Sequence, residues 1–216
     1  MRQGTLNVRN QIGPETGAKA ISLRILEFDP GHSSELRNEE LDELLFSLDS
    51  CTLFIDGVAH RIEPETGIYI NARQSFRVEN SGAEPVRFVS SQAPHQEGEI
   101  KTTIVRLADQ RAMPTGDRWY RVLIDSEVTQ FVGSIPPGRA PDHFHEYEEV
   151  LFILKGEGRV WLGEESRPIS YGSCIYLPRK QVHCVENTGT GELRLLGVFY
   201  PAGSPAVRYE TSTQNP

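Results

Sequence analysis

The second half of the chain contains two histidines and a glutamate whose spacing could form a metal site. His143 and His145 are two residues apart, so on a β-strand both side chains project to one face. Glu149 opens the apolar run EVLFILK, in which Leu151 and Ile153 share its face. A glutamate at the start of a buried row costs free energy unless a positive charge neutralises it. A divalent metal held with the two histidines would supply that charge.

A third histidine, His183, comes from a distant hairpin and could complete this set. Three imidazoles and one carboxylate leave open positions on a six-coordinate ion. These donors suit Fe, Mn, Ni or Zn, and the sequence does not distinguish among the four. The alternative interpretation of an isolated His-x-His pair is a surface pair or a satisfied core pair. Because Glu149 and His183 accompany the pair here, we expect one divalent transition metal per chain.

The elements that must position these residues are predicted to be short strands. Apolar, β-branched and aromatic runs alternate with turn residues, and the chain contains 19 Gly and 14 Pro. The segment NEELDELL could form one helical turn or an acidic loop entering a strand, and we favour the loop. The pattern therefore predicts an all-β fold. The expected strands are 20–28, 44–48, 51–55, 67–70, 86–91, 102–107, 119–124, 128–135, 149–155, 158–163, 173–178 and 193–200.

An internal repeat divides the chain of 216 residues into two copies of one β unit. Pro30-Gly31 recurs as Pro137-Gly138, and VENSGAEPVRF at 78–88 recurs as VENTGTGELRL at 185–195. The offset is 106 to 107 residues throughout. The predicted organisation is an N-terminal tail at 1–18, a first barrel at 19–93, a connector at 94–118, a second barrel at 119–202 and a C-terminal tail at 203–216. Both tails are expected to be loosely ordered or to depend on a partner for their order.

Two motifs of the second copy resemble those of the cupin superfamily. The first runs from Gly138 to Gly156 as G-x4-HxH-x3-E-x6-G, and the second runs from Gly172 to Asn187 as G-x5-PxG-x2-H-x3-N. Lys180 replaces the glycine of the second motif. The resemblance is strong over 128–200 and degenerate over 20–91. It implies a bicupin, with two tandem antiparallel jelly-roll barrels of the RmlC-like type.

The same resemblance implies the metal ligands His143, His145, Glu149 and His183. It places Asn187 in support of the hairpin.

The first copy is expected to lack the metal. Mapping by the repeat offset puts Arg37 and Glu39 where the His-x-His pair of the second copy stands, and Phe76 where the third histidine stands. Only Glu43 survives, and one carboxylate with an arginine cannot make a comparable ligand set. Arg37 is expected to pair with Glu43 or with Glu39. This barrel would then serve in packing, in dimerisation or in shaping the mouth of the other barrel.

Composition bounds the partners of the chain. The net charge of −8 and the pI near 5.3 disfavour nucleic acid and anionic membranes as partners. The first residues contain no apolar run typical of a secretory signal, and three cysteines, Cys51, Cys174 and Cys184, do not suggest a disulfide framework. A cytoplasmic location is expected. Open sheet edges favour a homodimer.

The expected function is metal-dependent action on a small oxygen-rich metabolite. The resemblance includes dioxygenases, isomerases, decarboxylases and lyases, and we favour dioxygenase-like chemistry over an isomerase or lyase. The alternatives are a non-catalytic sugar- or metabolite-binding cupin and a storage-type bicupin. Candidate residues for recognising the ligand are Arg121, Gln130, Arg139, Tyr147 and Lys180.

Overall fold

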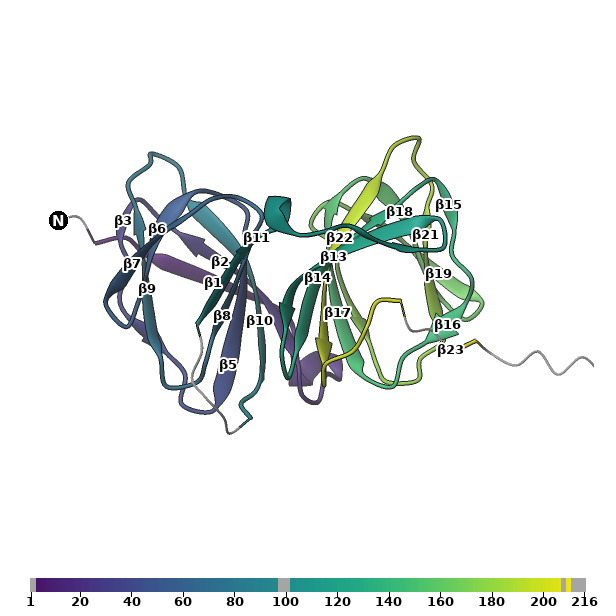
Figure 1. The fold of residues 1–216 in the computed structure, drawn as a ribbon, viewed down its shortest axis with the longest axis horizontal. Helices are drawn as coiled ribbons and strands as arrows, with labels where there is room; N and C mark the ends of the chain where they lie inside the picture. The colour runs from purple at the N-terminus through teal and green to yellow at the C-terminus, as the bar shows by residue number, and fades with distance from the viewer. Residues whose placement is uncertain (1–2, 97–101, 207–208, 211–216) are drawn as a thin grey trace, which may run out of the picture. The chain divides into compact units, whose positions relative to one another are not determined.

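The computed structural model describes residues 3–96, 102–206 and 209–210. The chain is nearly all β and divides between Gln110 and Arg111 into an N-terminal and a C-terminal unit. Each unit is an antiparallel barrel of jelly-roll type, made of two sheets that face each other (Figure 1). The all-β fold and the two tandem barrels predicted from the sequence are therefore confirmed.

The N-terminal barrel is built from two sheets. One has the strand order β1-β2-β10-β5-β8-β11, and the other has the order β3-β9-β6-β7 with β4 also paired to β9. Its elements are β1 (Leu6–Ile12), η1 (Pro14–Thr16), β2 (Ser22–Phe28), β3 (Gly31–His32), β4 (Leu36–Arg37), β5 (Leu41–Ser47), β6 (Cys51–Ile55), β7 (Val58–Ile62), β8 (Thr66–Ile70), β9 (Ser75–Asn80), β10 (Val86–Pro94), β11 (Thr103–Arg106) and η2 (Leu107–Asp109).

The C-terminal barrel repeats this plan. Its sheets have the orders β12-β13-β14-β22-β17-β20 and β19-β18-β21-β16-β23, and β15 also pairs with β21. Its elements are β12 (Met113–Thr115), β13 (Arg118–Asp125), β14 (Thr129–Ile135), β15 (Gly138–Arg139), β16 (His143–Phe144), β17 (Glu148–Lys155), β18 (Glu157–Leu162), β19 (Glu165–Ser170), β20 (Cys174–Leu177), β21 (His183–Asn187), β22 (Leu193–Tyr200) and β23 (Tyr209–Glu210).

Equivalent asparagines close equivalent hairpins in the two barrels. The Asn187 amide donates to the carbonyls of Ile135 and Gly191, and its oxygen accepts from the Gly189 N–H. In the first copy the Asn80 amide donates to the carbonyls of Phe28 and Glu84, and its oxygen accepts from the Gly82 N–H. Asn187 thus supports the hairpin, as the resemblance implied. The shared device shows that the sequence repeat is a structural repeat.

Several strands do not appear among the runs expected from the sequence. β1 and β19 are largely polar, and the five-residue β7 leaves Val58 and Ala59 exposed, so apolar alternation does not mark these strands. β1 pairs with β2 along nearly its whole length, so part of the stretch indicated as an N-terminal tail is a sheet strand. β12 was not expected either, and it lies inside the expected connector at 94–118, whereas β11 in the same connector falls on the strand expected at 102–107. Backbone pairing with a neighbour stabilises such strands without an apolar pattern of their own.

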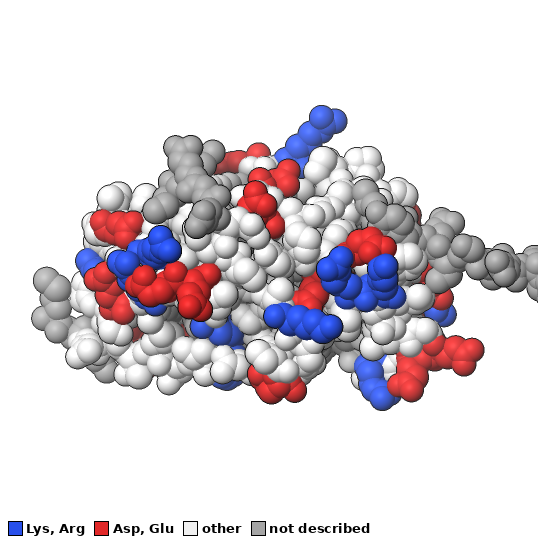
Figure 2. All heavy atoms as spheres, turned by 90° about the horizontal axis from the view of Figure 1, so that it is seen from below, with Lys and Arg blue, Asp and Glu red and all other residues white. Residues whose placement is uncertain are grey.

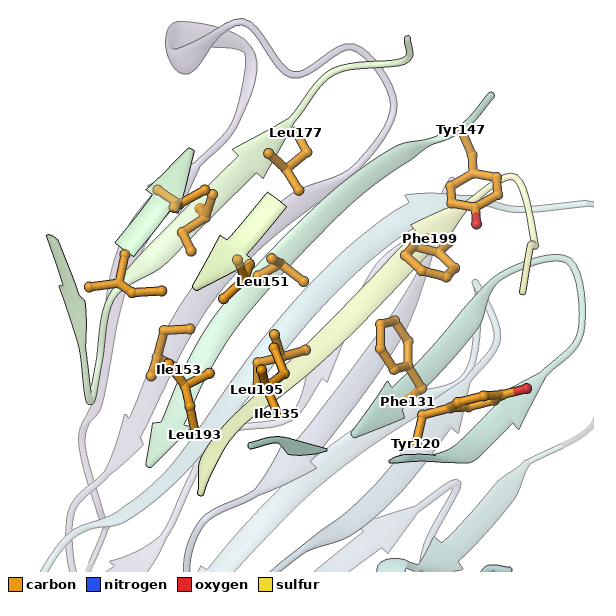
Figure 3. Packing of buried hydrophobic residues seen from close by; sticks show 14 residues of the cluster. Tyr120, Phe131, Ile135, Tyr147, Leu151, Ile153, Leu177, Leu193, Leu195 and Phe199 are labelled. Atoms are coloured by element: carbon orange, nitrogen blue, oxygen red, sulfur yellow. The ribbon is translucent and has the colours of Figure 1, made fainter. Parts of the chain in front are cut away.

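The core of the C-terminal barrel lies between its two sheets and leads directly to the histidines. Figure 3 shows Phe131 and Phe199 next to each other, with Leu151 and Leu195 to their left in the same interior. The rings of Phe131 and Phe199 have centroids 4.8 Å apart. These side chains alternate along β14, β17 and β22, so each strand contributes every second residue to the interior. The interior is therefore apolar up to the level of Glu149.

The surface carries both signs of charge. On the face in Figure 2, acidic and basic side chains are interspersed. Among the described residues, no helix has the length and apolar character needed to cross a bilayer.

The burial of two cysteines predicts their reactivity. Burial raises the pKa of Cys51 to about 12 and that of Cys184 to about 11, so at pH 8 both are thiols, which react poorly. Cys174 is partly exposed. We expect iodoacetamide to label Cys174 in the folded chain, and the other two only after denaturation, as peptide mass spectrometry would show. Labelling of Cys184 as fast as Cys174 would contradict this.

Candidate metal centre

Three histidines converge at one end of the C-terminal barrel. His143 on β16 and His183 on β21 are cross-strand partners, and His145 follows two residues after His143. One nitrogen from each imidazole lies within 4.8 Å of the others. His145 and His183 are buried, and His143 is half-buried. The structure thus brings together the three histidines that the sequence singled out.

Glu149 lies at the same point, at the start of β17. Its Oε2 is 3.7 Å from Nε2 of His145 and 3.8 Å from Nε2 of His183. These distances are too long for hydrogen bonds. Metal bonds of about 2.0–2.2 Å place two donors on one ion roughly 3–4.3 Å apart. The separations therefore fit donors that share an ion better than donors bonded to each other.

Backbone carbonyls orient two of the imidazole rings. Nδ1 of His143 donates to the carbonyl of Pro141 at 3.0 Å, and Nδ1 of His183 donates to the carbonyl of Gln181 at 2.7 Å. With the proton on Nδ1, the lone pair lies on Nε2. Such bonds typically fix the tautomer and orientation of metal-binding histidines.

Burial disfavours the charged form of two of the four side chains in the absence of a cation. Burial raises the pKa of Glu149 to about 8 and lowers the pKa of His183 to about 4. The carboxyl is then protonated, and His183 neutral, near pH 7. A bound divalent cation would favour the carboxylate and neutral imidazoles together. The chemistry of the donor set therefore fits a metal ion.

The turn before His183 carries Lys180 at the motif's usual glycine position. Lys180 has a φ of 64°, the left-handed conformation that explains a preference for glycine there. Its backbone N–H donates to the carbonyl of His145 at 2.7 Å, which ties this turn to the histidine strand. Its Nζ lies 3.5 Å from Glu146 on the exposed surface. The side chain therefore points away from the histidines and pairs with a surface acid.

A small pocket opens in front of the histidines. Its volume is about 100 Å³, which is near the space occupied by three water molecules in the liquid, at about 30 Å³ each. The walls are mainly apolar, with Arg118 as a cationic group. The lining residues include Trp119, Tyr120, Phe131, Ile135, Ala140, Leu151, Val185, Leu195 and Phe199.

The Tyr147 ring packs against His145. Its ring stacks on His145 with centroids 4.8 Å apart and planes inclined by 11°. Its hydroxyl donates to the carbonyl of Ser204 at 3.0 Å. Tyr147 was a candidate for ligand recognition. Its contacts instead make it a residue that positions His145.

The remaining recognition candidates lie elsewhere in the barrel. Arg121 and Gln130 alternate with pocket-facing neighbours and lie on the other side of their strands. The guanidinium of Arg139 lies 4.1 Å above the Trp161 ring, with its Nε 3.3 Å from Cys184 Sγ. The sequence analysis missed Arg118, whose only local signal is that it shares strand parity with Tyr120.

Close packing around Phe131 yields a second prediction. A methyl group at Gly197 would overlap the Phe131 ring, because β22 and β14 pair at this point. We expect Gly197→Ala to lower the free energy of unfolding by roughly 1–3 kcal/mol, since an overpacked core must shift. Gly191→Ala is the matched control, because a methyl group there meets nothing within 4 Å. Equal denaturant midpoints for the two variants would refute this packing.

The N-terminal barrel has different residues at the equivalent point, and the expected mapping is wrong by one residue. Leu36, rather than Arg37, stands opposite Phe76, as His143 stands opposite His183. By the same count, Asn38 rather than Glu39 corresponds to His145. The first copy has one more residue than the second between this position and the glutamate, since Glu43 follows Leu36 by seven positions and Glu149 follows His143 by six. An alignment offset taken from the glutamate therefore misplaces the residues that correspond to the histidines.

The charged residues of that barrel pair in two separate places. Arg37 bonds Glu39 at 2.6 Å on the exposed surface, which is one of its two expected partners. The partner of Glu43 is Arg24, whose Nη2 lies 2.7 and 2.8 Å from the two carboxylate oxygens.

Comparison with known proteins agrees with this architecture. The family model described as a cupin domain matches residues 131–199. An uncharacterized protein of Aquifex aeolicus is 29% identical over 85 residues, covering 38% of this chain and 69% of that protein. Auxin-binding protein 1 of Arabidopsis thaliana is 35% identical over 83 residues, covering 34% of this chain and 42% of that protein. This chain thus spans less than half of the length of the auxin-binding relative.

Solved structures match over both barrels. A putative glyoxylate-induced protein from Pseudomonas aeruginosa has a TM-score of 0.80 at 17% identity, over 93% of this chain and 83% of that one. A deletion mutant of oxalate decarboxylase from Bacillus subtilis has a TM-score of 0.73 at 14% identity, over 92% of this chain and 73% of that one. At these identities the likeness concerns the fold. The family model and the two motifs show a cupin domain in the C-terminal barrel, and the solved structures show that the whole chain has the two-barrel fold of a bicupin.

Proposed function

We propose that the C-terminal barrel binds one divalent transition metal and acts with it on a small oxygen-rich molecule. The observation that carries this proposal is the convergence of three imidazoles and a buried carboxylate on one small pocket. His143, His145, Glu149 and His183 would be the ligands. In the described part of the chain, the three histidines are the group close enough to hold an ion, and Glu149 Oε2 lies 3.7 and 3.8 Å from two of them.

The residues of the chain prepare the site for a bound substrate. The carbonyls of Pro141 and Gln181 keep the Nε2 lone pairs of two histidines available. Apolar walls formed by Phe131, Leu151 and Phe199 exclude water and hold the carbon skeleton of a ligand. A bound ion would supply Lewis acidity, or redox chemistry if it is iron or manganese.

Arg118 supplies the positive charge of the pocket wall. Its side chain is 9% exposed, and its Nη1 is held at 2.8 Å by Asp117. A guanidinium fixed in this way favours a carboxylate or enolate oxygen on the substrate. The pocket therefore suits a small oxo or hydroxy acid with a short apolar part.

Dioxygenase-like chemistry is the reaction that we favour, and isomerase or lyase chemistry is its competitor. The purified chain is first analysed for metal content, and is then reconstituted with Fe(II), Mn(II), Ni(II) or Zn(II). Oxygen consumption is measured with small oxo and hydroxy acids, in air and under nitrogen. Turnover that requires oxygen and Fe(II) supports the dioxygenase. Equal turnover under nitrogen would overturn it in favour of an isomerase or lyase.

A non-catalytic binding protein is the second candidate. The observation that favours it is the similarity to a relative named for binding auxin. Saturable binding of one of these acids to the metal-loaded chain, with no product by mass spectrometry, would support this function. Less than roughly one-tenth of an ion per chain after reconstitution would defeat the metal-dependent enzyme and leave the binding protein as the candidate.

We further propose a cytoplasmic homodimer that binds neither nucleic acid nor membrane. Sheet edges such as β7 and β19 offer backbone groups for pairing with a second copy. Sedimentation equilibrium is expected to give twice the chain mass of 24.2 kDa. A mass of one chain at micromolar concentration would exclude the dimer.

A further inference from the structure

The N-terminal barrel contains a second pocket at the position equivalent to the metal centre. Strand pairing matches Arg24, Ser90 and Gln92 with Phe131, Gly197 and Phe199 of the other barrel. The aromatic wall of the C-terminal pocket is thus replaced by polar side chains. The pocket has a volume of about 160 Å³.

These polar side chains bind Glu43, the pocket glutamate that corresponds to Glu149 in the other barrel. Nη2 of Arg24 contacts both carboxylate oxygens of Glu43, and Gln92 Nε2 donates to Oε2 at 3.0 Å. The hydroxyl of Ser90 donates to Oε1 and accepts from Arg24. The carboxylate is 7% exposed and is saturated with donors. A guanidinium therefore does here what a metal ion would do in the second barrel.

Three polar groups of the pocket wall remain available to a ligand. Among residues 3–96 and 102–206, no hydrogen bond reaches Nη1 of Arg24, Oε1 of Gln92 or Nδ2 of Asn38. The Asn38 oxygen already accepts from two backbone N–H groups, which fixes its amide. All three residues line the pocket, beside Leu26 and Phe76. The wall thus offers two donors and one acceptor next to apolar surface.

We propose that this pocket binds a small uncharged molecule with a carbonyl or hydroxyl oxygen and a polar hydrogen, such as an amide, without a metal. Arg24 is paired with Glu43, and Arg37, which also lines the pocket, is paired with Glu39. The lining residues that the structure describes therefore have no unpaired charge, and an anion would meet Glu43 whereas a cation would meet Arg24. A cavity of about 150 Å³ accommodates a ligand of roughly six non-hydrogen atoms. Amide and hydroxyl groups match the two donors and the acceptor.

The test compares acetamide with acetate, because the two have the same shape and differ in charge. Each is titrated into the ¹⁵N-labelled full-length chain, with and without EDTA, and the signals of Asn38, Ser90 and Gln92 are followed. We expect acetamide to shift these signals equally in both buffers, and acetate to bind more weakly. No shift with acetamide would overturn the proposal, as would tighter binding of acetate or loss of binding in EDTA.

Two variants locate the binding. Arg24→Met with Glu43→Leu removes the ion pair as a unit, and should weaken acetamide binding by roughly tenfold or more, because a charged donor is lost. Gln92→Leu keeps the ion pair and removes the acceptor, and should weaken binding as well. Unchanged affinity in Gln92→Leu would overturn the assignment even if the double variant failed to fold.

Discussion

Replacing His183 with alanine is expected to abolish tight metal binding and to remove the stabilisation that the metal provides. His183 is 4% exposed, and its Nε2 lies 3.8 Å from Glu149. At a metal concentration about 100 times the dissociation constant, binding stabilises the folded chain by about 2.7 kcal/mol. For a barrel of this size that equals roughly 10 °C in melting temperature. Elemental analysis and thermal unfolding with and without metal measure both effects.

His60→Ala is the matched control for this variant. His60 lies on β7 of the N-terminal barrel, outside the histidine cluster, and is partly exposed. It should retain the metal content and the metal-dependent melting temperature of the parent chain. If His183→Ala behaves like His60→Ala in both measurements, His183 is not a ligand, and the proposed metal centre fails.

Replacing Arg24 with methionine is the second change with a large expected effect. It removes the cation from Glu43, which stays buried among Ser90 and Gln92. Breaking a buried ion pair on one side costs about 3–5 kcal/mol, because the remaining charge has no compensation. With 20% of the Arg24 side chain exposed, the lower end of that range applies, and the melting temperature should fall by roughly 10 °C.

Two comparisons separate this effect from the loss of a surface charge. Arg9→Met breaks the exposed pair with Glu27, which is 3.8 Å long and should contribute less than about 1 kcal/mol. The double variant Arg24→Met with Glu43→Leu should recover most of the loss, because an apolar pair of similar volume replaces an ion pair at little cost. A single variant as stable as Arg9→Met would show that Glu43 needs no cation.

The residues of the C-terminal site could be predicted because their spacing along single strands determines which face of the strand they occupy. A His-x-His pair on one strand must share a face, and a glutamate that begins an apolar strand must lie inside, wherever the sheets pack. The third histidine was identified by its motif, and β21 places it directly opposite His143. The repeat likewise predicted two barrels, because equal spacing of turn residues and apolar runs produces equal strand orders.

Strand register accounts for what could not be predicted. In the first copy one additional residue before Glu43 shifts the alignment, so Leu36 rather than Arg37 faces Phe76. Polar edge strands such as β1 carry no apolar alternation, because solvent covers most of their side chains. Pairing with a neighbour determines both features, and the neighbour is distant in the chain.

By itself, the sequence determined the all-β fold, the two barrels and the four residues that meet in the C-terminal pocket. Only the tertiary structure decided that Arg24 neutralises Glu43, that Arg118 enters the pocket wall and that Tyr147 stacks behind His145. The physical reason is that the features readable from the sequence follow from the alternation of side chains along a single strand. The contacts of Arg24, Arg118 and Tyr147 depend instead on which strands become neighbours in the sheets. Arg24, for example, contacts Ser90, which is 66 residues away in the chain.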